Sequence, residues 1–176
     1  RPAGGQLTCV NNHSFDLAKD GYCNLLLAHR KRSKNPGDDK VMLAARHEFL
    51  GAGLYAPLAA AIVDILAPHV SNQSTLLDSG CGDGYYAEFI YRALEPSIRG
   101  IDIARDGVRM AARRFKGVER AQFAVASSFD LPLADGCLDA VLQVFAPISD
   151  AEVARVLKPG GVYCVVSPGH QHLGAL

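Results

Sequence analysis

The sequence has no long apolar run, no net charge and no paired framework of cysteines. No stretch approaches the roughly 20 apolar residues of a membrane-spanning helix, and no signal-peptide pattern opens the chain. Its five cysteines are an odd number without close spacings, which favours free thiols or metal ligands over disulfides. These absences argue against a membrane protein and a disulfide-stabilised secreted domain, and they predict a soluble, cytoplasmic protein.

What the sequence does contain is enough apolar material for one core. With 49% hydrophobic and 20% charged residues, its 176 residues can bury one good core plus a small appendage. The zero net charge conceals an uneven distribution. Residues 1–50 carry eight Lys/Arg against five Asp/Glu, whereas residues 51–176 carry ten against thirteen. The amino-terminal part is therefore the more favourable face for nucleic acid.

Strand and helix patterns alternate along the chain after an irregular head that ends near Asp38. The predicted strands cover 75–79, 98–102, 121–126, 138–144 and 162–167, and the predicted helices cover 41–50, 57–66, 85–94, 105–115 and 151–157. This alternation predicts an α/β protein with a doubly wound, mostly parallel sheet that binds ligands at the carboxyl ends of its strands. We expect two units, a head at 1–38 and a larger domain at 39–176.

The most informative motif is D-x-G-x-G-x-G, from Asp78 to Gly84, between a predicted buried strand and a predicted helix. Gly80 and Gly82 let the backbone approach a ligand, and the helix offers free N–H groups at its start. A dinucleotide fingerprint would have its third glycine at Tyr85. The acid at Asp78 would repel a pyrophosphate but pair with an ammonium group such as that of S-adenosylmethionine. The motif therefore resembles motif I of the Rossmann-like (class I) methyltransferases.

A second acidic residue follows at the distance that such a fold requires. Asp102 ends the next predicted strand, 24 positions after Asp78. An acidic residue about 20 positions past the glycine turn binds the ribose hydroxyls of an adenosine, which predicts that role for Asp102. The alternative is that Asp102 only caps the helix that begins near Arg105.

Two later segments also resemble methyltransferases. The stretch 123–132 is similar to the strand and loop that hold the adenine, and L-K-P-G-G at 157–161 is similar to the turn before the fifth strand. The second segment has a structural role, because proline and glycine end a helix there. In the adenine loop, Asp130 stands one position after the expected acid. Ser127 and Ser128 occupy the expected place, which leaves the contact with the adenine amino group open.

The resemblance then narrows to one family and covers almost the whole chain. The head motif C-V-N-N-H-S-F-D-L-A-K-D-G-Y at 9–22, F-L-G-A-G-L-Y-A-P-L at 49–58 and P-G-H-Q-H-L at 168–173 resemble the bacterial 23S ribosomal RNA guanine-N1 methyltransferases. That family includes macrolide-resistance members. The resemblance implies methylation of a guanine N1 in a hairpin of 23S ribosomal RNA with S-adenosylmethionine. It also implies zinc in the head and a homodimer, with no membrane or DNA partner.

The motifs and the resemblance together select a set of candidate site residues. Those expected to bind the cofactor are Tyr55, Asp78, Gly80, Gly82, Asp83, Asp102, Ile103, Ala126, Ser127 and His172. For Tyr55, packing at a helix start is an equally good interpretation. Phe145, after the fourth strand, is positioned to stack on the target base, with core packing as the alternative. No residue is nominated as the base that removes the N1 proton.

In the resembled family the head is a zinc finger, and Cys9 and His13 match its second ligand pair, Cys-x3-His. Zinc requires four ligands, yet no C-x2-C precedes Cys9, and Cys23 occupies a position that the family does not use. Either the first pair lies upstream of Arg1 or this copy has lost its metal. We expect truncation at both ends, with two sheet strands missing at the carboxyl end. Alternatively, Cys9 is a small buried residue and His13 a surface one.

A basic run follows the head motif and suits phosphate contacts. Its predicted RNA-binding residues are Arg30, Lys31, Arg32 and Lys34, and a solvated charge run is the alternative. Two other functions remain open on the sequence. One is methylation of a small molecule of the quinone or metabolite type, because the core would look much the same. The other is a non-catalytic RNA-binding module that retains a fold for S-adenosylmethionine.

The zinc hypothesis leads to the first testable prediction. The full-length protein should carry one zinc ion per chain, and the double variant Cys9→Ala/His13→Ala should lose it, because two ligands alone cannot close a tetrahedral site. Elemental analysis of the purified proteins measures this. Full zinc retention in the double variant would rule out these ligands.

Overall fold

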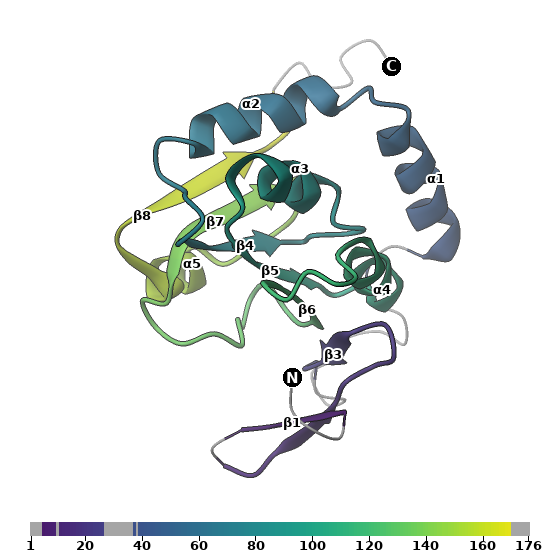
Figure 1. Cartoon of the computed structure of the whole chain (residues 1–176), viewed down its shortest axis with the longest axis vertical. Helices are drawn as coiled ribbons and strands as arrows, with labels where there is room; N and C mark the ends of the chain where they lie inside the picture. Colours follow the sequence, from purple (N-terminus) through teal and green to yellow (C-terminus); the bar gives the residue numbers. More distant parts are fainter. Residues whose placement is uncertain (1–4, 10, 27–36, 38, 170–176) are drawn as a thin grey trace.

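The centre of the computed structural model, which describes residues 5–9, 11–26, 37 and 39–169, is a parallel six-stranded sheet (Figure 1). Its order is β3-β6-β5-β4-β7-β8, with the bounds β3 Tyr22–Asn24, β4 Thr75–Ser79, β5 Ser97–Asp102, β6 Ala121–Val125, β7 Leu138–Val144 and β8 Leu157–Val166. The chain runs from β4 outward through β5 to β6 and then crosses to β7 and β8 on the other side of β4. The strand order therefore reverses between β4 and β7, which confirms the predicted doubly wound, Rossmann-like fold.

Helices cover both faces of this sheet. They are α2 Ala56–Leu66, α3 Tyr85–Leu94, α4 Arg105–Arg114 and α5 Asp150–Val156, whereas α1 Lys40–Gly51 packs its Leu50 with Ala59 of α2 and Tyr85 of α3. The helices α2, α3 and α4 bury their apolar residues in one cluster with Leu76, whereas α5 packs into a second cluster with Leu77. Because successive residues of a strand point to opposite faces, β4 is covered on both sides and forms the middle of the core.

The predicted elements match the observed ones closely, with one correction at β8. This strand begins at Leu157, five residues before the predicted start, and Leu157 pairs with Leu138. The register then shifts, and pairing resumes between Ala140 and Val162. The residues 158–161 therefore form an irregularity within the strand, so the L-K-P-G-G turn interrupts the ladder without ending it.

The amino-terminal residues form a hairpin and contribute a strand to the central sheet. In the hairpin, β1 (Gln6–Thr8) pairs antiparallel with β2 (Ser14–Asp16). The short strand β3 pairs parallel with β6, with Tyr22 opposite Phe123 and Asn24 opposite Val125. The sheet thus reaches into the segment that the sequence assigned to the head. The division at residue 38 stays a prediction.

Among the described residues, no single helix has the length and apolar composition needed to cross a membrane. Only α1 and α2 pass that test together, and the two helices are bent by 78° relative to one another. In α1, the buried residues are Leu43 and Leu50, so most of this helix is in contact with solvent.

Candidate functional site

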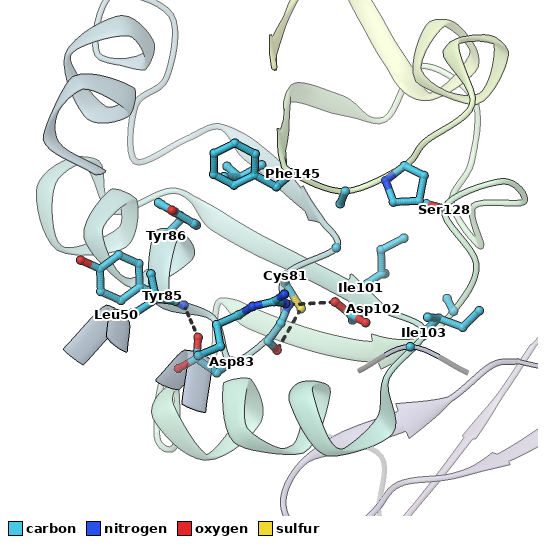
Figure 2. Close-up of a pocket in the computed structure, with 18 of the residues that line it drawn as sticks. Leu50, Cys81, Asp83, Tyr85, Tyr86, Ile101, Asp102, Ile103, Ser128 and Phe145 are labelled. Carbon is cyan, nitrogen blue, oxygen red and sulfur yellow. Dashed lines mark hydrogen bonds between the residues drawn. The ribbon is translucent and has the colours of Figure 1, made fainter. Parts of the chain in front are cut away.

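A cavity of about 610 Å³ opens at the carboxyl ends of the central strands, beside the reversal of strand order (Figure 2). This is the place where open α/β sheets bind their ligands. The sequence-predicted residues that line it are Tyr55, Gly80, Gly82, Asp83, Asp102, Ile103, Ala126, Ser127 and Phe145. The structure therefore brings together most of the predicted cofactor residues. His172 lies outside the described residues.

The glycine turn forms the floor of this cavity. Gly80 and Gly82 both have left-handed backbones, with φ of 79° and 51°. A Cβ on Gly80 would lie 2.3 Å from the Cβ of Ala146, so that glycine is required by packing. A Cβ on Gly82 would have no heavy atom of the protein within 4 Å. Because Gly82 also lines the cavity, the absence of its side chain leaves room for a ligand.

Asp102 fixes the turn from the neighbouring strand. Its Oδ2 accepts a hydrogen bond from the backbone N–H of Gly82 at 2.9 Å, and its Oδ1 accepts one from the N–H of Ala104 at 2.8 Å. The bond to Ala104 belongs to the start of α4, whose N-cap is Ala104. No side-chain bond caps α4, so Asp102 is not its cap; Asp102 shapes the turn before the helix and lines the cavity. Its contact with a ribose stays a prediction.

Asp78 lies beneath the turn and does not line the cavity. The residue is 2% exposed, and its Oδ2 has no hydrogen-bond partner among the described residues. Burial, followed by the nearby Asp102 and Asp83, raises the pKa of Asp78 to about 7, while a backbone hydrogen bond from Ala87 opposes this increase. A buried carboxylate with one unpaired oxygen, next to the glycine turn, fits a cationic group of a ligand. Its pairing with the ammonium group remains a prediction.

Asp83 is held by several groups of the protein. Its Oδ1 accepts a bond from the N–H of Tyr85 at 3.2 Å, and its Oδ2 accepts one from Nη2 of Arg114 at 2.6 Å. His47 Nδ1, on α1, lies 2.6 Å from the same Oδ2. Arg114 also binds the backbone carbonyl of Asp83 and the carboxylate of Glu88. Asp83 therefore anchors the first turn of α3, and its direct contact with a cofactor stays a prediction.

Sequence reasoning missed Arg114 and His47. They lie 31 and 36 positions from Asp83 in the chain. No motif marks either residue, because an arginine on an amphipathic helix reads as a solvated charge. Only the packing of α4 and α1 beside the glycine turn reveals their role.

Phe145 lies across the cavity from Asp83 (Figure 2), and Tyr55 and Phe49 also line the cavity. Phe145 follows β7 with a left-handed backbone, φ of 51°, and is 47% exposed. Its ring meets Tyr55 edge to face at 6.4 Å between centroids, and Tyr55 meets Phe49 at 5.6 Å. A half-exposed phenylalanine in a strained conformation favours contact with a ligand over core packing.

The loop that carries Phe145 has its own support, which the sequence did not reveal. The side-chain amide of Gln143 donates a hydrogen bond to the carbonyl of Ala146, and its Oε1 accepts one from the hydroxyl of Tyr163 on β8. These bonds tie the strands β7 and β8 to the loop. They hold Phe145 at the cavity wall.

At the adenine loop, the two serines face the cavity as the sequence suggested. Ser127 and Ser128 line it, whereas the exposed Asp130 is not among its walls. The hydroxyl of Ser127 accepts a bond from the N–H of Phe129 at 3.1 Å. The contact with the adenine amino group therefore stays unassigned.

Cys9 and His13 lie at the tip of the hairpin of β1 and β2. The N–H of Cys9 donates to the carbonyl of His13 at 3.0 Å, and the N–H of Asn12 donates to the carbonyl of Cys9 at 3.0 Å. Both residues are exposed, which goes against the alternative that Cys9 is a small buried residue. The hairpin thus supplies two donors of the right chemistry. In the described part of the chain, no group of three or more His, Cys, Asp or Glu residues forms a metal site.

Comparison with known proteins finds two family models and several relatives that resemble this chain. A methyltransferase-domain model matches residues 76–161, and the zinc-ribbon model "RlmA, N-terminal" matches residues 2–34. The chain is 37% identical over its full length to a 23S rRNA (guanine(748)-N(1))-methyltransferase of Streptomyces fradiae. Over 95% of its length, it is 35% identical to a provisionally named 23S rRNA (guanine-N(1)-)-methyltransferase of Micromonospora griseorubida. Over its full length the chain is therefore similar to 23S rRNA guanine-N1-methyltransferases, and its core matches the methyltransferase domain.

The match covers only part of the length of these relatives. The chain spans 62% of the Streptomyces relative and 60% of the Micromonospora relative. Among solved structures, a provisionally named S-adenosyl-L-methionine-dependent methyltransferase from Methanococcus maripaludis superposes with a TM-score of 0.65. It is 21% identical, and the match covers 77% of this chain and 67% of that one, which shows the shared fold alone.

The open space at Gly82 leads to a prediction for cofactor binding. Gly82→Ala should weaken the affinity for S-adenosylmethionine at least tenfold, because the added methyl group enters the space of the ligand. Gly136→Ala is the matched control, since Gly136 has a similar φ of 57° and also has nothing within 4 Å of an added Cβ. Titration calorimetry measures both. Equal affinities of the two variants would contradict the assignment.

The burial of Asp78 leads to a prediction for stability. The carboxyl binds its proton more tightly in the folded state, where its pKa is about 7, than at its ordinary value of 3.8. Its ionisation therefore lowers the free energy of unfolding progressively between pH 4 and 7, by up to ~4 kcal/mol. Without cofactor, Asp78→Asn should melt at a higher temperature than the wild type at pH 8, and this difference should shrink at pH 4.

The same variant should bind S-adenosylmethionine more weakly, because it lacks the charge that we expect to pair with the ammonium group. Asp64→Asn, which alters an exposed residue of α2, is the control and should change neither property. Thermal unfolding at the two pH values and calorimetry measure these effects. A stability difference for Asp78→Asn that does not depend on pH would show that no buried charge is being removed.

Proposed function

We propose that the protein transfers the methyl group of S-adenosylmethionine to N1 of a guanine in a hairpin of 23S ribosomal RNA. The main support for this proposal is that the relatives match both the amino-terminal head and the methyltransferase core of this chain. The relatives named for this reaction align with the whole chain, including the zinc-ribbon segment at 2–34. A small-molecule methyltransferase would need only the core, so this match disfavours that alternative.

The cavity suits the binding half of this reaction. When bound, S-adenosylmethionine supplies a methyl group already activated by its sulfonium charge, so the main task of the protein is alignment. We propose that Gly82 allows close approach of the donor and that Asp102 binds its ribose. Asp78, buried below the turn, would neutralise the ammonium group. The proposed cofactor contacts also include Tyr55, Gly80, Asp83, Ile103, Ala126 and Ser127.

The aromatic wall suits the acceptor half. A guanine paired through N1 has to leave its helix before N1 is accessible, at a cost of a few kcal/mol. We propose that Phe145 stacks on the extruded base and recovers part of this cost, since stacking on an aromatic ring contributes about 1–3 kcal/mol. Gln143 and Tyr163 act as positioning residues that hold the Phe145 loop. We assign no base for the N1 proton.

Other parts of the proposal rest on the family resemblance. They are the homodimer, the cytoplasmic location, a zinc ion on Cys9 and His13, and the division into units at residue 38. His172 and the basic residues Arg30, Lys31, Arg32 and Lys34 belong to the proposed site as well. All five lie outside the described residues, so sequence alone supports their roles.

Methyl transfer to a ribosomal RNA hairpin tests the function. The full-length protein should transfer a labelled methyl group from S-adenosylmethionine to a hairpin of 23S ribosomal RNA, and Gly82→Ala should reduce the rate at limiting cofactor while Gly136→Ala should not. A methyl group on N1 blocks base pairing, so primer extension should stop at one guanine. Replacing that guanine by adenine should abolish the transfer.

Two results would redirect the proposal. Transfer to small acceptors without transfer to RNA would favour small-molecule methylation. Cofactor and RNA binding without transfer to any acceptor would favour a non-catalytic RNA-binding module.

A further inference from the structure

The helix α4 carries the largest excess of positive charge among the described helices. It has four arginines and one aspartate, a net charge of 4 − 1 = +3. By comparison, α3 has one arginine and one glutamate, and α5 has one arginine against an aspartate and a glutamate. The inner side of α4 is apolar and packs against the core, where Val108, Ala111 and Ala112 are buried. Its charge is therefore confined to the remaining surface of the helix.

Three of the arginines form a row on that surface. Arg105, Arg109 and Arg113 are spaced four residues apart and are all exposed, and the exposed Lys116 follows just beyond the helix. Residues four apart lie on the same side of a helix, about 6 Å apart along its axis. We call Arg105, Arg109, Arg113 and Lys116 the α4 row. Arg114 does not belong to it, because it turns inward to Asp83 and Glu88.

The row connects the cavity with the amino-terminal segment. At one end, Arg105 stands two residues after Ile103, which lines the cofactor cavity. At the other end, Arg109 and Arg113 both bind Asp20, with N–O distances of 3.3 and 2.9 Å. The single carboxylate of Asp20 thus pairs with two arginines, so this end of the row keeps a net positive charge. The pairing also holds the side chain of Arg113 in place. Beside this end lies a hollow of about 1030 Å³, lined among others by Lys19, Arg113 and Lys116.

We propose that the α4 row and Lys19 bind consecutive backbone phosphates of the RNA that delivers its guanine to the cavity. This inference rests on the proposed function and deepens it. An evenly spaced line of cations matches a polymer with evenly repeated negative charges better than it matches a single anion. Because one end of the row adjoins the cavity, RNA bound along it would reach the cofactor site. Such contacts would position the RNA without reading its sequence.

The measurement is the salt dependence of RNA binding by the full-length protein. In the variant Arg105→Glu/Lys116→Glu, neither altered side chain has a hydrogen-bond or ion-pair partner among the described residues, and the bonds of Asp20 remain. Loss of two phosphate contacts should reduce the slope of log K against log salt by about 1.4–1.8. Affinity for a 23S ribosomal RNA hairpin should fall at least tenfold at low salt. Affinity for S-adenosylmethionine should not change.

The control is Arg92→Glu/Lys158→Glu, which makes the same change in net charge on α3 and β8. Its slope should stay near that of the wild type, and thermal unfolding checks that all variants are folded. Arg105→Gln/Lys116→Gln, which removes charge without reversing it, should show the same loss of slope as the charge reversal. Equal slopes for the row variant and the control would overturn the inference and reduce the row to a solvated face.

The outcomes also separate this inference from the proposed function. A wild-type protein that neither binds nor methylates the hairpin would contradict the function itself. A wild-type protein that methylates the hairpin, with a row variant that keeps the wild-type salt slope, would contradict only the role of the α4 row.

Discussion

The hydrogen bond from the backbone of Gly82 to the carboxylate of Asp102 joins the ends of β4 and β5, and the cavity depends on it. A left-handed glycine turn is free to adopt many conformations, and this bond selects one. Asp83 fixes the other side of the turn by accepting bonds from Tyr85 and Arg114. The floor of the site is therefore shaped before a ligand arrives, which reduces the ordering cost of binding.

This arrangement gathers three carboxylates in a small volume. Asp102 and Asp83 have protein partners, whereas Asp78 is buried with one oxygen unpaired. Burial, and then repulsion by the two other carboxylates, raise the pKa of Asp78, so the site has an electrostatic cost in the absence of a ligand. A cationic ligand group would relieve that cost. The strain that destabilises the free protein would thereby contribute to selectivity for a positively charged cofactor.

The helix α4 has three separate tasks on its different sides. Its apolar residues complete the core, Arg114 supports the glycine turn, and the row from Arg105 to Lys116 remains exposed. Overall charge counts concealed this row, because residues 51–176 have more acidic than basic residues. The position of charges on one helix surface matters more for binding a polyanion than the total for the segment.

Most of the architecture was predictable from local patterns. The periods of apolar residues predicted the strands and helices, and the D-x-G-x-G-x-G motif with Asp102 indicated where the cavity lies, because these signals lie within short stretches of chain. The tertiary structure decided the rest. The pairing of β3 with β6, the contacts of Arg114 and His47 with Asp83, and the support of the Phe145 loop by Gln143 and Tyr163 join residues distant in sequence. Such contacts depend on how the elements pack. A three-residue strand is too short to show a hydrophobic period, and the identity of a single polar side chain does not indicate which residue it will contact.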